Sequence, residues 1–326
     1  MLLVTGGAGF IGSNVVAALN DAGRADVVVC DLLGHDGKWR NLAKRQLADI
    51  VPPAELPAWL NGRRLDAVIH LGAISETTAT DGDLVIETNF RLSMRLLDWC
   101  TAHPTPLIYA SSAATYGDGG QGFVDDPSPP ALKMLRPMNL YGWSKHLFDM
   151  AVAERSARGA PLPPQCVGLK FFNVFGPNEY HKGPMMSVLA RRFDELRSGA
   201  TVQLFKSHRE GIADGDQRRD FIYVDDVVRV MMWLLATPSV SGLFNVGTGH
   251  ARSFRDLMLA AYAALGTRPN IDYIDMPLAI RDSYQYFTQS DVDRLRRAGY
   301  NAGFTALEDA VGAYVKDFLD RPDRFR

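Results

Sequence analysis

The sequence has little cysteine, and this scarcity excludes several classes of protein. Its 326 residues include three cysteines, Cys30, Cys100 and Cys166, scattered along the chain. Three cysteines cannot all pair within one chain, and their spacing is not that of a metal site. A disulfide framework is therefore not expected, no metal is expected, and a reducing compartment fits the composition.

The sequence also lacks long apolar runs and any excess of charge of one sign. Net charge is -2, with no basic block of the kind that binds nucleic acid. No apolar run approaches the roughly 20 residues of a membrane span. A glycine-rich turn begins at Gly6, which leaves no room for a signal peptide. We expect a cytoplasmic protein that contacts neither nucleic acid nor membrane.

In the first half of the chain, short apolar strands alternate with amphipathic helices. Strands that are apolar throughout and are separated by helices are typical of a parallel sheet covered on both faces. The pattern predicts an α/β fold with a doubly wound parallel (Rossmann) sheet. The expected strands are 2–5, 26–31, 66–70, 106–112 and 166–172, and the expected helices are 11–20, 89–100 and 143–153.

The rhythm changes after about Pro177, where short strands mix with helices. We expect residues 1–176 to form the NAD(P)-binding domain. Residues 177–326 should form mainly a second, smaller α/β substrate lobe, with the chain crossing between the two. The polar stretch 206–220 reads as a long loop, and loops of that length are often functional. The expected strands here are 201–205, 242–246 and 271–274, and the expected helices are 184–198, 224–236, 253–265 and 305–319.

The segment T-G-G-A-G-F-I-G (5–12) lies between the first strand and the first helix. Its glycines allow a tight turn and close approach to a pyrophosphate, which the N–H groups of the helix N-terminus can bind. Asp31 ends the second strand, where a carboxylate can bind the adenosine ribose. Asp31 disfavours a 2′-phosphate, whereas Lys38 and Arg40 can reach one, so NADP and NAD both remain open.

Two further segments belong to the predicted cofactor site. H-L-G-A (70–73) ends the next long strand, and we expect Leu71, Gly72 and Ala73 to let the backbone approach the cofactor. His70 reads as a packed residue at the strand end. Asn89 lies near the start of the expected helix 89–100, where it can cap the helix or brace the loops of the site.

Tyr141 and Lys145 form the pattern Y-x-x-x-K and share one face of a helix. A tyrosine has a pKa near ~10, and an ammonium one turn away favours the phenolate that a base requires. Upstream, Ser112 ends a strand at the crevice of the sheet, where its hydroxyl can bind the reacting oxygen. Together these residues predict a hydride-transfer centre.

At this point the motifs resemble a known family. T-G-G-A-G-F-I-G, S-S-A-A-T-Y-G, Y-G-W-S-K and F-F-N-V-F-G-P are similar, over nearly the whole chain, to the extended short-chain dehydrogenase/reductase family of NAD(P)-dependent nucleotide-sugar epimerases and dehydratases. F-N-V-F-G-P-N-E-Y-H-K-G (172–183), R-D-F-I-Y-V-D-D (219–226), F-N-V-G-T-G (244–249) and S-Y-Q-Y-F-T-Q-S-D (283–291) resemble the branch that epimerises ADP-heptoses.

The resemblance implies an isomerase that inverts C6″ of ADP-D-glycero-β-D-manno-heptose to give the L-glycero form for the lipopolysaccharide core. NADP, with NAD possible, would be oxidised and reduced again within one turnover. We also expect a homo-oligomer. By resemblance, cofactor contacts fall on Gly6, Gly9, Phe10, Ile11, Gly12, Asp31, Lys38, Ser75, Asn89, Tyr141, Lys145 and Val174, catalytic roles on Ser112, Tyr141, Lys145 and Lys182, and substrate contacts on Ser112, Asn173, Lys182, Arg191, Phe205, Arg219 and Tyr284.

The chemistry of inversion independently favours a second base. Hydride must leave one face of the carbon and return to the other, so the keto intermediate must turn and its oxygen must move. Tyr141 can serve one orientation and Lys182 the other, provided that burial lowers the pKa of the lysine. His181 reads as a structural neighbour. The guanidinium of Arg219 suits a diphosphate.

Some positions depart from the family pattern and keep other sugars open. Leu32 follows Asp31 where a polar residue is expected, and Pro184 and Arg191 stand where Ser and His are expected; the 206–218 loop is long. A UDP-hexose 4-epimerase is one alternative, and it would not need Lys182. A dehydratase would carry an acidic pair after Ser112. A non-catalytic NAD(P)-binding protein would have no need of the intact Ser112, Tyr141 and Lys145.

Overall fold

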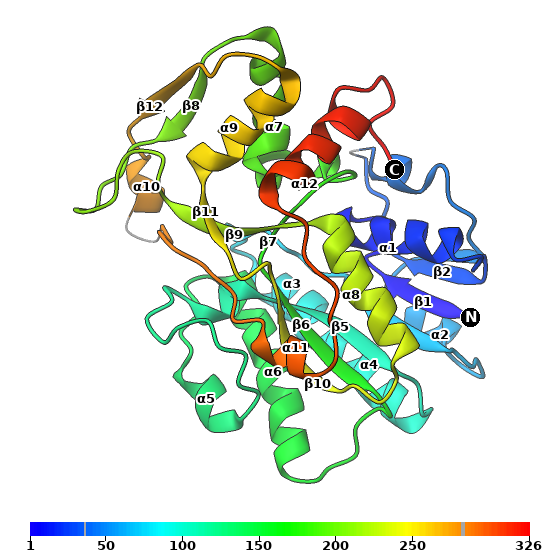
Figure 1. The fold of residues 1–326 in the computed structure, drawn as a ribbon. Coiled ribbons are helices and arrows are strands. Elements are labelled where there is room, and N and C mark those ends of the chain that lie inside the picture. Colours follow the sequence, from blue (N-terminus) through cyan, green and yellow to red (C-terminus); the bar gives the residue numbers. More distant parts are fainter. Residues whose placement is uncertain (36, 282–283) are drawn as a thin grey trace.

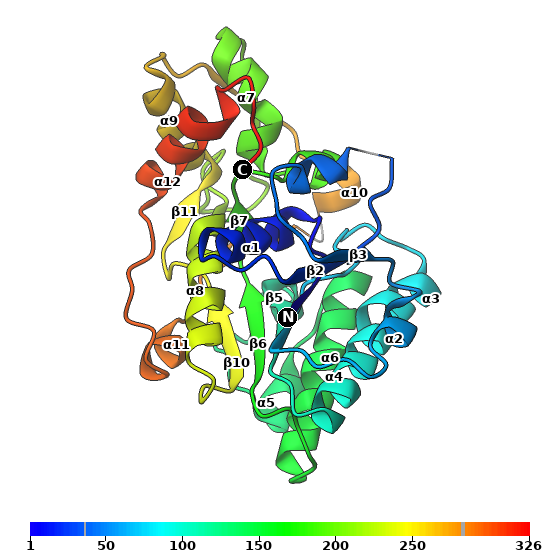
Figure 2. The ribbon, with the colours of Figure 1, turned by 90° about the vertical axis from the view of Figure 1, so that its right-hand side faces the viewer.

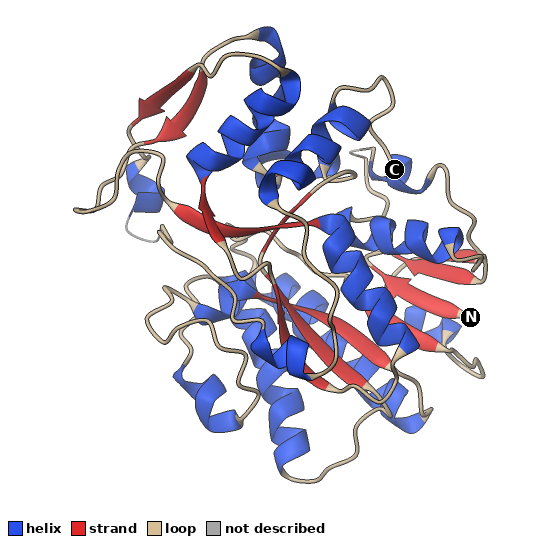
Figure 3. Ribbon diagram, viewed as in Figure 1, coloured by secondary structure: helices blue, strands red, loops and turns tan. Residues whose placement is uncertain are grey.

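The computed structural model describes residues 1–35, 37–281 and 284–326 and is built around a seven-stranded parallel sheet (Figures 1 and 3). The strand order is β10-β6-β5-β4-β1-β2-β3, so the direction of winding switches between β1 and β4. This is the predicted doubly wound sheet. Its strands are β1 (Leu2–Thr5), β2 (Val27–Cys30), β3 (Asp49–Val51), β4 (Ala67–His70), β5 (Leu107–Ser112), β6 (Cys166–Phe171) and β10 (Gly242–Val246).

Helices cover both faces of this sheet (Figure 2). Alternate residues of a strand point to opposite faces. Val4 of β1 accordingly packs in one core with residues of α1 and α8, whereas its neighbour Leu3 packs in a second core with residues of α4 and α6. The helices are α1 (Phe10–Asp21), α8 (Val224–Ala236), α4 (Leu92–Ala102) and α6 (Leu140–Ala157), with shorter α2 (Leu56–Trp59), α3 (Gly82–Val85) and α5 (Pro129–Met134).

A smaller group of elements lies beyond the carboxyl ends of the large sheet (Figure 1). In it β7 pairs with β9 and β9 with β11, while β8 pairs with β12. A separate apolar core holds these elements together, with Phe193, Tyr262 and Tyr314 at its centre. The elements are β7 (Asn173–Phe175), β8 (Val202–Phe205), β9 (Arg218–Tyr223), β11 (Ala251–Ser253), β12 (Ile271–Ile274), α7 (Val188–Ser198), α9 (Phe254–Leu265), α10 (Leu278–Arg281) and α12 (Leu307–Tyr314).

The second half of the chain also contributes to the large sheet. Strand β10 pairs with β6 at the sheet edge, Gly242 opposite Val167. Leu295 of α11 (Asp293–Arg297) belongs to the same core as the sheet and helices α1 and α8. The chain thus crosses between the two groups of elements more than once.

Two predicted boundaries differ from the observed ones in ways that bear on the site. The helical segment expected from residue 89 begins at Gly82, because the Asp81 carboxylate caps it by accepting from the Leu84 N–H, and it passes through a π-helical turn (Ile86–Arg91) into α4. Asn89 is therefore inside the helical segment. Strand β9 begins at Arg218, so 218–220 are strand rather than loop.

Within the described part of the chain no helix is long and apolar enough to cross a membrane.

Candidate active site

An open cavity of about 470 Å³ lies at the carboxyl ends of the strands, beside the switch between β1 and β4. Doubly wound sheets bind their ligands at this place. The structure brings most of the predicted residues to its wall: Gly6, Gly9, Phe10, Ile11, Gly12, Asp31, Lys38, Leu71, Gly72, Ala73, Ser75, Ser112, Tyr141, Lys145, Asn173, Val174 and Lys182.

The glycine turn at one end of the cavity has room for backbone alone. A Cβ on Gly12 would overlap the carbonyl oxygen of Gly6, so a side chain there would force the turn apart. A Cβ on Gly6 would lie 2.6 Å from the Gly72 nitrogen, and Gly6 itself has φ +67°. Helix α1 starts directly after this turn with no side-chain cap, which leaves its first N–H groups available for a pyrophosphate.

Asp31 stands at the end of β2 and faces the glycine turn. Its carboxylate accepts from the Ala8 N–H at 2.9 Å and from the Leu32 N–H at 2.8 Å. The Lys38 ammonium lies 2.6 Å from Oδ1 of this carboxylate, the oxygen that also accepts from Leu32. Within the described part of the chain the Asp31 carboxylate is thus paired with the Lys38 ammonium, and this pair bears on how a ribose or a 2′-phosphate is received.

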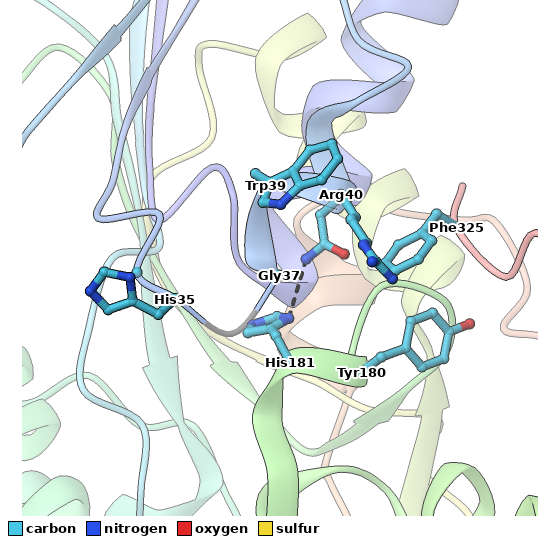
Figure 4. Close-up of a pocket in the computed structure, with 9 residues that line it drawn as sticks. His35, Gly37, Trp39, Arg40, Tyr180, His181 and Phe325 are labelled. Carbon is cyan, nitrogen blue, oxygen red and sulfur yellow. Dashed lines mark hydrogen bonds between the residues drawn. The ribbon is translucent and has the colours of Figure 1, made fainter.

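A second cavity of about 620 Å³ adjoins this corner (Figure 4). Its wall combines the guanidinium of Arg40 with the rings of His35, Trp39, Tyr180 and Phe325. His181 lines both cavities and is joined to the Asn41 amide, Nδ2 to Nδ1, at 3.2 Å. Arg40, considered from the sequence as a phosphate contact, therefore lies in a neighbouring cavity rather than at the wall of the main one.

The predicted hydride-transfer residues meet at the middle of the main cavity. The Asn139 side chain caps α6 by accepting from the Gly142 N–H, which places Tyr141 in the first turn and Lys145 one turn later. Gly142 lets the helix pack closely, because a Cβ there would lie 2.7 Å from the Ala114 carbonyl oxygen. Ser112 comes from the end of β5 and is hydrogen bonded to Tyr141.

Burial is the largest cause of the pKa shifts of these residues. It raises the pKa of Tyr141, while the hydrogen bond from Ser112 lowers it. Burial lowers the pKa of Lys145 to about 8, and the carboxylate of Asp149 opposes that fall. His70 at the end of β4 has its pKa lowered to about 3 by burial, so it is a neutral packed residue bound to Thr5 and Ser93.

Lys182, from a segment after β7, lines the same cavity. It lies in the 3-10 segment Tyr180–Met185, before Gly183, whose φ is +52°. The ammonium lies 5.1 Å from the centroid of the Phe10 ring. Burial lowers the pKa of Lys182, and the nearby carboxylate of Glu179 opposes this.

Glu179 anchors the loop that carries Lys182, a role that no sequence motif signalled. Its carboxylate is fully buried and accepts from the Ser187 N–H at 2.5 Å and the Ser187 hydroxyl at 2.8 Å. It also accepts from the Gly176 N–H and from the Tyr314 hydroxyl of α12. One carboxylate therefore closes the loop between residues 176 and 187.

Residues 324–326 contact the same loop through hydrogen bonds. The Tyr180 hydroxyl donates to the Arg324 carbonyl at 2.8 Å, and the Arg326 N–H donates to the Asn178 side chain at 3.0 Å. Asn178 is fully buried with φ +73°, and its amide donates to Ser13 of α1. The loop is thus held between helix α1 and residues 324–326.

Four of the predicted substrate residues form a separate cluster beside the cavity. The Arg219 guanidinium lies 5.2 Å from the Tyr284 ring, which meets the Phe205 ring edge to face at 6.2 Å. Arg219 also lies over Phe254, which does line the cavity. Arg191 faces Tyr284, since each influences the pKa of the other. Ser283 of the 283–291 segment lies outside the described residues.

Asn89 does not reach the cavity but braces it. Its fully buried amide exchanges hydrogen bonds with the Ile74 backbone and donates to the Ser144 hydroxyl. This ties the strand-end segment 71–75 to helix α6. Among the described residues no group of three or more His, Cys, Asp or Glu is arranged to hold a metal ion.

The sequence did not single out several apolar residues of the cavity wall. Met185, Met186 and Val188 follow Lys182, and Phe171, Phe172 and Phe175 flank Asn173. The Met-Met run after H-K-G was a usable signal, because flexible thioethers commonly line binding surfaces. The aromatic residues gave none, since apolar runs at strand ends are read as core.

Comparisons with known proteins identify the family of the chain. The model of the NAD dependent epimerase/dehydratase family matches residues 2–247. ADP-L-glycero-D-manno-heptose-6-epimerases of Nitratidesulfovibrio vulgaris (strain DP4) and Fusobacterium nucleatum are 47% and 42% identical to the chain, each aligned over 100% of both proteins.

Solved structures extend the likeness. The Helicobacter pylori ADP-L-glycero-D-manno-heptose-6-epimerase matches with a TM-score of 0.79 and 28% identity, over 97% of this chain and 95% of that one. The Thermus thermophilus UDP-glucose 4-epimerase complex with NAD matches with a TM-score of 0.75 and 26% identity, over 98% and 99%. The resemblance inferred from the motifs is confirmed, and the chain belongs to the NAD dependent epimerase/dehydratase family.

Proposed function

We propose that the protein inverts C6″ of ADP-D-glycero-β-D-manno-heptose through a keto intermediate, with a bound nicotinamide cofactor that leaves each turnover unchanged. One observation carries the proposal. Tyr141 and Lys182, which come from different elements, face the same cavity, and burial brings the pKa of Lys182 below its ordinary value. The relatives named as heptose epimerases support the sugar.

The residues present fit such a cofactor. The glycine turn and the open N-terminus of α1 suit its pyrophosphate, and Asp31 suits its adenosine ribose. We assign Lys145 to the nicotinamide ribose. When bound, such a cofactor would supply the acceptor and donor of hydride for C6″.

The two bases would divide the proton transfers. Tyr141 as phenolate removes the proton of the 6″-hydroxyl, with Ser112 holding the oxygen, as hydride leaves the carbon. After the intermediate has turned, Lys182 as ammonium protonates the oxygen as hydride returns to the other face. Each turnover moves one proton from Lys182 to Tyr141 by way of substrate, and exchange with water restores both.

We propose NADP as the natural cofactor. Lys38 neutralises Asp31 at 2.6 Å, which removes the repulsion that an unpaired carboxylate would exert on a 2′-phosphate. Arg40 lines the adjoining cavity and adds positive charge to that corner. The mass of the cofactor released from denatured protein decides between NADP and NAD.

We further assign residues 1–176 to the NAD(P)-binding domain and residues 177–326 mainly to the substrate lobe. Arg219, in the cluster around Tyr284, is placed to bind the diphosphate. We also propose that the protein acts in the cytoplasm as a homo-oligomer.

The test is direct. Purified protein is mixed with ADP-D-glycero-β-D-manno-heptose, and the C6″ configuration is followed by NMR. We expect conversion to an equilibrium mixture of both epimers without added cofactor. No inversion of the heptose together with inversion of a UDP-hexose would refute the proposal in favour of a 4-epimerase. Inertness toward every nucleotide sugar would indicate a non-catalytic binding protein.

A further inference from the structure

A buried ion pair lies directly behind the proposed catalytic residues. The Lys170 ammonium on β6 lies 3.0 Å from Oδ2 of Asp149 on α6, and both side chains are completely inaccessible to solvent. Buried ion pairs give little net stability, because desolvation offsets the attraction, and apolar residues of the same size often serve as well. The pair therefore calls for an explanation other than stability.

The pair joins every element that carries a proposed catalytic group at this end of the cavity. The Ser111 hydroxyl donates to Asp149 at 2.7 Å, and Lys170 donates to the Thr115 hydroxyl at 2.5 Å. The Lys170 ammonium also lies 4.7 Å from the Tyr116 ring centroid. Lys170 stands opposite Ser111 in the sheet, one residue before Ser112.

The pair also sits close in sequence to the reacting groups. Asp149 follows Lys145 by one helical turn and Tyr141 by two, so all three share one face of α6. Among the described residues Oδ1 of Asp149 is buried without a hydrogen-bond partner that meets the usual geometry, and the nearest phenol, that of Tyr109, carries no charge to neutralise the carboxylate. The charge of Asp149 therefore acts along the helix toward the cavity.

We propose that Asp149 and Lys170 are positioning residues, which dock the catalytic face of α6 on β5 and β6 and set the electrostatic potential at Lys145 and Tyr141. This rests on the function proposed above. Neither residue touches the cavity that holds the reaction, and neither belongs to the Y-x-x-x-K pattern.

Two other ionisable groups on elements packed against this part of α6 do not supply this potential. His70 on β4 is neutral, as its pKa is lowered to about 3 by burial. On the helical segment before α4, Glu87 is exposed and is paired with Arg91 and Arg95. Asp149 is the charged neighbour that opposes the effect of burial on the pKa of Lys145, and it also raises the pKa of Tyr141.

The two members of the pair should therefore act in opposite directions. Asp149→Asn keeps the shape and removes the negative charge, so the pKa of Lys145 falls below about 8 and that of Tyr141 falls with it. Lys170→Met removes the compensating charge, so the full field of Asp149 reaches Lys145 and its pKa rises. A residue that only packs the helix would move neither pKa in a charge-dependent direction.

The experiment titrates lysine labelled with carbon-13 at Cε by NMR, with the Lys145 signal assigned by Lys145→Arg. It needs no substrate. We expect the lowest midpoint in Asp149→Asn and the highest in Lys170→Met. The neutral double variant, Asp149→Asn with Lys170→Met, should lie between them and fold even if Lys170→Met does not. Lys170→Arg should restore the wild-type midpoint.

The same variants are then assayed for epimerisation against pH. Asp149→Asn should shift the whole profile to lower pH, so that relative turnover above pH 8 falls by roughly tenfold more than at pH 6.5. Loss of turnover at every pH with an unmoved Lys145 midpoint would overturn the inference. Absence of epimerisation by the wild type would refute the proposed function instead, and the NMR titration would still decide the role of the pair.

Discussion

Replacing Lys182 by methionine separates the two proposed bases. Methionine matches the side chain as far as Cε and removes the ammonium. What the fold loses is the contact with the Phe10 ring at 5.1 Å, worth about 0.5–1 kcal/mol. What the reaction loses is a general acid/base, a factor of roughly 10²–10⁴ in rate, or about 3–5 kcal/mol in the barrier. The second effect is several times larger, so inversion should nearly stop in a protein that is folded and retains its cofactor.

The assay supplies each epimer separately to the Lys182→Met protein. The epimer whose hydroxyl faces Tyr141 should still lose its hydride, so reduced cofactor accumulates and is seen by its near-ultraviolet absorbance. The other epimer should leave the cofactor oxidised. Lys133→Met is the matched control, because Lys133 is an exposed residue of α5 outside the cavity wall.

Two results would contradict the reasoning. Wild-type turnover in Lys182→Met would show that Lys182 is not a base. Equal loss of hydride transfer from both epimers, with weaker substrate binding, would show that it binds substrate and leaves the second proton transfer to another group.

Four further changes have definite expected outcomes. Tyr141→Phe should show the opposite specificity to Lys182→Met. With the epimer that Lys182→Met still oxidises, the cofactor of Tyr141→Phe should stay oxidised, and accumulation of reduced cofactor there would contradict the assignment. The Gly12→Ala protein should be purified without bound cofactor and should have a lowered Tm, because the added Cβ overlaps the Gly6 carbonyl oxygen. Cofactor retained at wild-type stoichiometry would show that the turn adapts. Lys38→Ala should reduce the preference for NADP over NAD by roughly tenfold or more, the size of one hydrogen bond to a charged group, in direct affinity measurements, and an unchanged ratio would remove Lys38 from that role. Turnover should decline above about pH 8 as Lys145 loses its proton, and a pH–rate profile that stays flat beyond pH 10 would show that its charge is not required.

The parts of the fold and site that follow from local sequence were predictable. A glycine turn after an apolar strand, an acid at the end of the next strand and an i, i+4 pair on a helix each specify their own geometry within a few residues. For that reason Gly12, Asp31 and the Tyr141 helix were placed correctly beside one cavity.

Features that depend on tertiary register were not predictable. Predicting that Lys170 pairs with Asp149 requires knowing which face of α6 packs against β6, and the local sequence does not determine that face. Strand β10 looked like part of the smaller lobe because its apolar run carries no information on its partner, β6. Lys182 and Phe10 are 172 positions apart, and the Arg219 cluster lies beside the cavity rather than in it.

Through their contacts with the loop of Lys182, residues 324–326 can influence the reaction from a distance. These residues touch the loop of Lys182 through Tyr180 and Asn178, yet none of them is among the described residues that line the main cavity. Deleting them should uncouple oxidation from inversion, so that the enzyme acts as a dehydrogenase arrested after half a cycle. The proposed two-base inversion would then require residues that do not line the cavity in which it takes place.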